Sequence, residues 1–113
     1  MSQYQNIIYE KKTEDKVAII TFNRPEARNA MSVAMLKEFN DALHRAAEDP
    51  EVWSIIVTGA GDKAFCSGGD AKEFLANVEA GKISEIERFN RLNLDVWRFM
   101  EKMRKPIIAA VNG

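Results

Sequence analysis

The chain has little of what marks several large classes of protein. Its 113 residues contain one cysteine, three prolines and six glycines. A single cysteine cannot form a disulfide within the chain, and this usage fits a reducing compartment. With 46% hydrophobic residues and so little proline and glycine, the composition excludes disordered and collagen-like chains. We therefore expect one ordinary globular domain with its own core.

Long apolar runs and an excess of positive charge are also absent. No apolar run approaches the ~20 residues of a membrane-spanning helix, and the N-terminal MSQYQNIIYEKK lacks the apolar core of a secretion signal. The 16 basic and 17 acidic side chains give a formal net charge of −1. Because binding to nucleic acid or to anionic membranes depends on accumulated positive charge, we expect neither partner. These features favour a cytoplasmic protein.

The first half of the chain shows strand, helix and strand patterns in turn. Two β-branched, apolar segments separated by the polar turn TEDK predict a hairpin over residues 6–22. Ser32 can cap a helix that runs to about Asp49, because apolar residues recur at helical spacing and Pro50 forces an end. The continuous apolar segment at 53–58 predicts a strand that is covered on both faces of its sheet.

The second half predicts two helices and a final strand. Capping-box spacing of Asp70 with Glu73 and of Ser84 with Glu87 predicts helices over 71–78 and from 84 to about 102. Apolar residues on one broad face of the longer helix, Trp97 among them, indicate burial. Residues 107–111, IIAAV, predict a third core strand. The predicted order is β-β-α-β-α-α-β, which is an α/β fold.

The most informative segment is GAGDKAFCSGGDAK at residues 59–72. It follows a predicted strand and places Gly68 and Gly69 before Asp70, which can open a helix. Adjacent glycines let the backbone approach a ligand and turn N–H groups toward it, and a helix N-terminus adds positive potential. The segment predicts a donor site for an oxygen that becomes negative during a reaction. Cys66 is interpreted as a small packing residue, because no histidine lies beside it to activate the thiol.

Three blocks of sequence resemble the crotonase family, also called the enoyl-CoA hydratase/isomerase superfamily. They are VAIITFNRPEARNAMS, IIVTGAGDKAFCSGGDAKEF and KPIIAAVNG, and their order and spacing resemble the family's N-terminal half. The resemblance implies a crotonase-like spiral of ββα units, truncated after the third core strand. Residues 1–113 would form the N-terminal part of that domain, without its C-terminal half and trimerisation helices. At full length, the resemblance implies a homo-oligomer, a trimer or hexamer.

The resemblance also implies an activity, which is hydration or isomerisation of an acyl-CoA thioester. The reaction passes through an enolate whose oxygen is held by two backbone N–H groups. The Gly69 N–H matches the first of these donors, and one such donor contributes ~3 kcal/mol to stabilising the transition state. Coenzyme A enters as part of the substrate, so the resemblance implies no separate cofactor and no metal.

A CoA-binding groove is implied as well. The positions that match it, mainly through backbone groups, are Ala27, Arg28, Ala30, Ser67, Gly68 and Asp70. Lys63 and Lys72 are expected either to reach the phosphates of CoA or to lie in solvent. Arg28 stands where many relatives carry leucine, so its side chain either adds a phosphate contact or lies in solvent.

Two other functions stay open. Gly59, Gly61 and Ala64 form a GxGxxA pattern after a strand, as in a dinucleotide-binding fingerprint. This alternative is the less favoured one, because the fingerprint needs a helix opening at the glycines, whereas residues 65–69 intervene here and no strand end with an acidic residue follows about 20 residues on. The other alternative is a non-catalytic crotonase-like piece that binds acyl-CoA or a protein partner. It arises because the second donor and the acid/base carboxylates would lie beyond Gly113. The 113-residue chain alone is then expected to be weakly active or inactive.

Two further expectations concern the surface. The acidic residues of the predicted helices are interpreted as a solvated face and not as catalytic acids; they are Glu73, Glu79, Glu85 and Glu87. Exposed apolar surface around residues 107–111 is expected to promote association.

Overall fold

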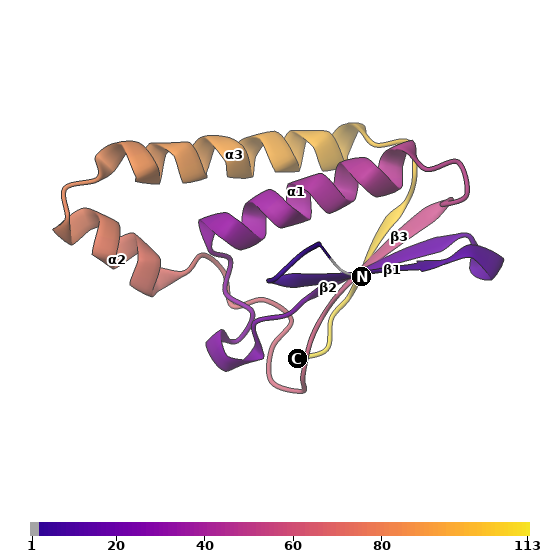
Figure 1. Ribbon diagram of the computed structural model, residues 1–113, viewed down its shortest axis with the longest axis horizontal. Helices are drawn as coiled ribbons and strands as arrows, with labels where there is room; N and C mark the ends of the chain where they lie inside the picture. Colours follow the sequence, from indigo (N-terminus) through magenta and orange to yellow (C-terminus); the bar gives the residue numbers. More distant parts are fainter. Residues whose placement is uncertain (1–2) are drawn as a thin grey trace.

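The computed structural model describes residues 3–113, which form one sheet and three α-helices (Figure 1). The elements are β1 (Ile7–Lys12), β2 (Val17–Phe22), α1 (Val33–Glu48), β3 (Ser54–Gly59), α2 (Ala71–Glu79), α3 (Ile83–Lys102) and β4 (Ile107–Ala110). Two short 3₁₀ turns, Thr13–Asp15 and Pro25–Ala27, lie in the first two connections. The predicted order of strands and helices is confirmed, and Ser32 caps α1 by accepting the Met35 N–H.

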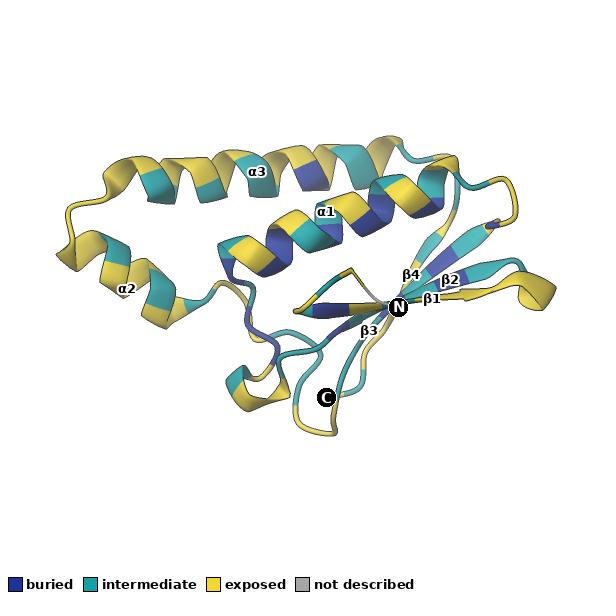
Figure 2. Cartoon of the chain, viewed as in Figure 1, coloured by how far each residue is buried: buried dark blue, intermediate teal, exposed yellow. Residues whose placement is uncertain are grey.

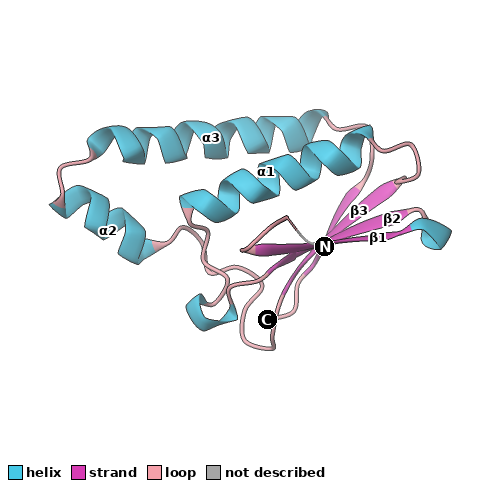
Figure 3. Cartoon of the chain, in the orientation of Figure 1, coloured by secondary structure: helices cyan, strands magenta, loops and turns pink. Residues whose placement is uncertain are grey.

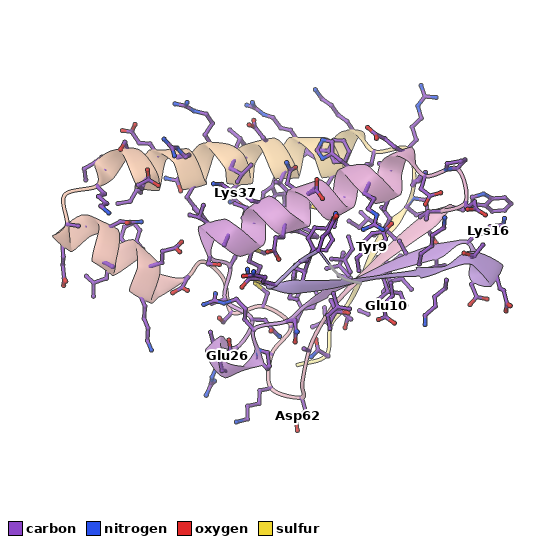
Figure 4. All side chains as sticks on the ribbon, viewed as in Figure 1. Tyr9, Glu10, Lys16, Glu26, Lys37 and Asp62 are labelled. Carbon is purple, nitrogen blue, oxygen red and sulfur yellow. The ribbon has the colours of Figure 1, made fainter. Side chains whose placement is uncertain are left out.

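The sheet has the strand order β1-β2-β3-β4. Strand β1 is antiparallel to β2, whereas β2, β3 and β4 are parallel to one another. Helix α1 connects β2 to β3, and α2 with α3 connects β3 to β4. Because parallel strands present their carboxyl ends at one edge, the segments after Phe22, Gly59 and Ala110 gather there (Figure 3). Figure 4 shows Glu26 and Asp62 on these segments, at the end of the molecule away from α3.

One face of the sheet and the inner face of α1 form the core. Alternate residues of β2 point to it, with Ala18, Ile20 and Phe22 buried, and Leu36 and Leu43 of α1 meet them. Helix α3 packs beside α1 and adds Val96 to the same core. Helix α2 has no buried residue, as its coloring in Figure 2 shows. Helix α1 buries six residues whereas α3 buries one, so α1 is the main cover of the sheet. Each fully buried leucine or valine contributes about 1.5–3 kcal/mol through loss of contact with water.

The prediction that the strand at 53–58 is covered on both faces is wrong for the described residues. Ile55 and Val57 are buried on the core face, whereas Ile56 on the opposite face is only half-buried. The strand predicted at the end of the chain exists, but β4 lies at the sheet edge and Ile108 is 51% exposed. An apolar run shows that a strand suits burial, but it does not show what covers the second face.

Two expectations for the longer helix are also wrong. Ser84 is not an N-cap: α3 begins at Ile83, after Lys82, whose side chain makes no capping bond. Trp97 is 57% exposed, whereas its neighbour Val96 is 1% exposed. Consecutive residues of a helix are turned about 100° apart, so a helix packed along one stripe buries only one of the two. The apolar face predicted from the sequence is therefore wider than the contact with α1.

Two asparagines hold the segment between β3 and α2 in place. Asn29 is fully buried; its side chain accepts the Arg24 N–H at 2.8 Å and donates to the carbonyls of Ala60 and Ala64. From the other side, the Asn112 side chain accepts the Gly59 N–H at 3.1 Å and donates to the Gly61 carbonyl at 3.0 Å. The segments that follow β2, β3 and β4 are thus joined by amide side chains.

Replacement of Asn29 by aspartate tests this arrangement. In Asn29→Asp, a buried carboxylate would face two carbonyl oxygens, and both donors would be lost. Both residue types adopt the left-handed backbone found here, at φ 57°, so the backbone cost is small. We expect the free energy of unfolding to fall by about 2 kcal/mol or more. Urea denaturation measures it, with Asn90→Asp on the exposed face of α3 as the matched control. Equal losses in the two variants would contradict the assigned role.

Lys105 provides a second test, at the other end of the molecule. Its ammonium donates to the carbonyls of Ala46 and Asp49, at 2.8 and 2.6 Å, at the C-terminus of α1. Lys105→Met removes two charge-assisted bonds and the cation at the C-terminus of α1, and leaves the two carbonyls only their backbone donors, the Asp49 and Val52 N–H groups. We therefore expect a loss of about 1–2 kcal/mol in thermal or urea unfolding. The control Lys102→Met changes an exposed lysine in the last turn of α3 and should cost less. A greater loss in the control would exclude this role.

Candidate functional site

The segment that carries the glycines lies beside the loop that precedes α1. Met31 and Gly69 form an isolated parallel bridge, in which the Met31 N–H donates to the Gly68 carbonyl at 2.8 Å and the Asp70 N–H donates to the Met31 carbonyl at 3.0 Å. One step earlier, the Ser67 N–H donates to the Arg28 carbonyl at 3.2 Å. The two segments are therefore joined by a short ladder, here called the Met31–Gly69 ladder.

This ladder leaves the Gly69 peptide groups unused. In a parallel bridge the central residue's neighbours make the bonds, so its own N–H and C=O turn to the opposite side. Within residues 3–113, the Gly69 N–H donates no hydrogen bond. The Gly69 amide, which the sequence predicts to donate a hydrogen bond to a substrate oxygen, thus has no internal partner within the described residues and faces away from the ladder.

The two glycines have different roles in the backbone. Gly68 has φ +107°, a conformation that side chains other than glycine rarely adopt. Gly69 does not have a positive φ, and a Cβ built on it would meet no atom within 4 Å. Gly68 is therefore required for the turn of the chain. Gly69 instead borders open space beside its N–H group.

Helix α2 begins directly after Gly69 and is capped by Asp70. One oxygen of the Asp70 carboxylate accepts the Lys72 and Glu73 N–H groups, at 3.1 and 3.2 Å, and the other accepts from the Arg24 guanidinium at 3.0 Å. Burial alone would raise the pKa of Asp70, but the Glu73 N–H, the Arg24 guanidinium and the Lys72 N–H together hold that pKa below its ordinary value. Asp70 therefore stays ionised at neutral pH, paired with Arg24 next to the free amide.

The predicted capping box is only half formed. Asp70 caps α2, but its own N–H is taken by Met31, so Glu73 does not reach back to it. Instead, the Glu73 carboxylate accepts the Val33 N–H of α1 at 2.8 Å and is half-buried. The interpretation of Glu73 as part of a solvated face is wrong, because its partner lies 40 residues away and leaves no trace in local spacing. Glu79 and Glu87 are exposed as expected, whereas Glu85 is half-buried.

Two hollows meet at Gly69. One, of about 230 Å³, lies between α2 and α3 and is lined by polar and apolar residues that include Glu73, Asn77, Glu85 and Asn90. The other, of about 510 Å³, lies under α3 and is mainly apolar, with Phe22, Phe65 and Val96 in its wall. Met31, Gly69 and Phe89 line both. A ligand group held by the Gly69 N–H would therefore have room on either side.

The structure places the predicted CoA-groove residues in two groups. Ala30, Ser67, Gly68 and Asp70 lie along or beside the Met31–Gly69 ladder. Arg28 and Lys63 line a third hollow of about 160 Å³ that also includes Gly61 and Asp62, although the Arg28 carbonyl accepts the Ser67 N–H of the ladder.

The remaining predicted residues are Ala27 and Lys72. Ala27 is half-buried in the 3₁₀ turn, and its carbonyl accepts the Ala30 N–H at 3.1 Å. Lys72 is exposed in the first turn of α2. Backbone carbonyls of the loop already accept one internal bond each at Ala27, Arg28 and Ala30, but each keeps a second lone pair for a ligand.

Sequence reasoning missed Arg24 and Met31. Arg24 lies in the NRP block, but only its contact with Asp70, 46 residues away, reveals its position at the site. Met31 contributes backbone groups, which no residue-type pattern can indicate. Cys66 is half-buried in the wall of the larger hollow, with its sulfur near the Gly68 carbonyl.

The dinucleotide alternative does not fit this geometry. Its fingerprint requires a helix that opens at Gly59 or Gly61, whereas the first helix after β3 begins at Ala71. The Gly59 N–H is occupied by the Asn112 side chain. A Cβ on Gly59 would lie 2.6 Å from the Phe65 carbonyl oxygen, so this glycine serves close packing within the chain.

Residues 3–113 contain neither a metal-binding cluster nor a membrane-spanning helix. No three histidine, cysteine, aspartate or glutamate side chains come together as a metal site would require. In the same part of the chain, no helix combines the length and the apolar character needed to cross a bilayer.

Comparison with known proteins agrees with this fold. The sequence model described as enoyl-CoA hydratase/isomerase matches residues 12–113. Crotonyl-CoA hydratase of Syntrophomonas wolfei is 44% identical over 110 residues, which are 97% of this chain and 40% of that protein. The chain thus spans about two fifths of the length of this relative.

Solved structures agree as well. An enoyl-CoA hydratase/isomerase from Xanthobacter autotrophicus Py2 superimposes with a TM-score of 0.84 at 40% identity, over 98% of this chain and 40% of that one. An enoyl-CoA hydratase from Rhodobacter sphaeroides 2.4.1 gives a TM-score of 0.87 at 30% identity, over 96% of this chain and 32% of that one. With its mixed α/β sheet and its sequence match from residue 12 to residue 113, the chain belongs to the enoyl-CoA hydratase/isomerase, or crotonase, family and corresponds to an N-terminal portion of it.

Proposed function

We propose that this chain binds the thioester group of an acyl-CoA and donates the Gly69 N–H to its carbonyl oxygen, as part of an enoyl-CoA hydratase or isomerase. The observation that carries the proposal is the Gly69 amide itself. It has no partner within residues 3–113, it borders two hollows, and the next residue, Asp70, is the N-cap of α2.

The chemistry explains why such a donor matters. When water adds to the β-carbon of an enoyl thioester, an electron pair moves to the thioester oxygen and an enolate forms, which is then protonated at the α-carbon. A preorganised N–H gains strength as negative charge develops on that oxygen, and one such donor contributes about 3–4 kcal/mol. The positive end of the α2 dipole acts in the same direction. The Gly69 segment therefore favours the enolate over the uncharged thioester.

The CoA part of the substrate would lie along the ladder and beside the hollow that Arg28 and Lys63 line. The pantetheine would lie along the Met31–Gly69 ladder, where loop carbonyls keep free lone pairs. The phosphates would lie near Arg28 and Lys63, two cations that line the same hollow. All of these groups stand at the carboxyl edge of the parallel strands, where open α/β sheets bind ligands.

A second function, binding without turnover, is favoured by the state of the nearby carboxylates. Asp70 is engaged by Arg24 and by two backbone N–H groups, and Glu73 is engaged by the Val33 N–H. A carboxylate held in this way is a poor proton donor or acceptor for a substrate. Crotonyl-CoA hydration by the purified chain separates the two functions. Turnover as fast as that of the hydratases it resembles would exclude the binding-only alternative.

Gly69→Val tests the proposed donor. A Cβ at this position meets no protein atom within 4 Å, so the fold should persist while the branched side chain fills the space beside the N–H. We expect the affinity for butyryl-CoA, an unreactive thioester, to fall at least ~10-fold, since steric exclusion removes both the hydrogen bond and the close approach. Isothermal titration calorimetry measures the affinity, and circular dichroism checks the fold.

Two controls accompany this test. Cys66→Ser changes the same segment and should leave butyryl-CoA affinity nearly unchanged. NAD replaces butyryl-CoA in a thermal-shift experiment on the unaltered chain, and stabilisation by NAD alone would overturn the assignment to acyl-CoA. Unchanged affinity in Gly69→Val would remove this amide from the site.

A further inference from the structure

Arg24 connects the two sides of the Met31–Gly69 ladder with one side chain. One nitrogen of its guanidinium donates to the Asp70 carboxylate at 3.0 Å, and the other donates to the Ala30 carbonyl. Asp70 follows Gly69 directly, and Ala30 precedes Met31. A single planar group thus holds both strands of the ladder next to the bridged pair, with two donors in a fixed fork.

Arg24 is itself held from behind. Its N–H donates to the buried Asn29 side chain at 2.8 Å, and its carbonyl accepts the N–H groups of Ala27 and Asn29, at 2.9 and 2.8 Å. The Arg24 and Asp70 side chains are 19% and 14% exposed, so their ion pair is largely shielded from water. Loss of one partner of such a pair leaves an uncompensated charge, which the surrounding segment must rearrange to solvate.

The segment that contains Gly69 is fixed by individual hydrogen bonds and by this ion pair, and not by regular secondary structure. Residues 60–70 contain no helix and no strand of the sheet, and two adjacent glycines lose more backbone freedom on ordering than any other residue pair. A hydrogen-bond donor must be held within about 10–20° of its productive direction to stabilise a developing charge. The direction of the Gly69 N–H therefore depends on its neighbours, and the Arg24–Asp70 pair is the charged link among them.

We propose that Arg24 is a positioning residue of this site, which fixes the direction of the Gly69 N–H by bridging Ala30 and Asp70 across the Met31–Gly69 ladder. The proposal rests on the proposed function, because it concerns the aim of the same donor. It assigns Arg24 no contact with the substrate. Its effect should appear in recognition of the thioester carbonyl and not in recognition of the rest of CoA.

A matched pair of ligands isolates that effect. Butyryl-CoA carries the thioester carbonyl, whereas S-butyl-CoA is the thioether of the same chain length without it. The ratio of their dissociation constants reports the hydrogen bond to the carbonyl, and one net hydrogen bond corresponds to about fivefold in the unaltered chain. In Arg24→Met, the ratio should fall toward one, while the affinity for S-butyl-CoA changes less than about twofold.

Two further variants keep the experiment decisive. Asp70→Asn keeps one capping oxygen for α2 but places an amide NH₂ against the guanidinium, so it breaks the bridge while leaving the Arg24 charge. It should lower the ratio as Arg24→Met does, and it decides alone if that variant does not fold. Arg45→Met removes an exposed arginine that stacks on Tyr9, away from the site, and should leave the ratio unchanged.

The outcomes separate the two proposals. A ratio near five in folded Arg24→Met and Asp70→Asn would overturn the positioning role while leaving the Gly69 donor intact. A fall in Arg24→Met without a fall in Asp70→Asn would also overturn it, because the missing positive charge alone would then explain the loss. A ratio near one in the unaltered chain would overturn the Gly69 donor itself, and the role of Arg24 with it.

Discussion

The Met31–Gly69 ladder is the constraint on which the rest of the site depends. Its bonds use the peptide groups on either side of Gly69 and so leave the Gly69 amide without a partner. Gly69 is exposed, so this N–H is open to water or to an incoming acceptor. Its direction is set by the hydrogen bonds of the surrounding backbone. Here those bonds come from the loop before α1, from the cap of α2 and from the Arg24–Asp70 pair.

The carboxylates of Asp70 and Glu73, beside Gly69, are engaged in hydrogen bonds that hold the structure. Asp70 and Glu73 each serve a helix N-terminus, Asp70 at α2 and Glu73 at α1, although both lie in the same segment. The N-terminal ends of both helices are thereby brought together beside the glycines, and their dipoles add positive potential there. Of these two carboxylates, Asp70 is paired with the Arg24 guanidinium, whereas Glu73 is bound by a backbone N–H. The two helix N-termini support the proposal that peptide groups of this region stabilise a developing anion.

Several large apolar side chains lie outside the core and remain exposed. The core lies on one face of the sheet, whereas Ile108, Val111, Leu94 and Trp97 remain 48–66% exposed. Relatives of known structure are much longer than this chain, which covers 40% of one and 32% of another. The family match covers residues 12–113. The proposed activity has the Gly69 amide as its physical basis.

The sequence by itself determined the order of strands and helices, the Ser32 and Asp70 caps and the family, because periodicity, capping residues and block motifs are local signals. It also indicated Gly69 as a candidate donor, since adjacent glycines before a helix cap favour a backbone that turns its N–H groups toward a ligand. Only the tertiary structure decided that Glu73 caps α1, that Arg24 binds Asp70, that β4 is an edge strand and that Trp97 is exposed. Each of these depends on whether a segment 40 or more residues away in the sequence lies alongside. The spacing of hydrophobic residues shows which side chains suit burial, but the packing of the whole chain decides which segment covers them.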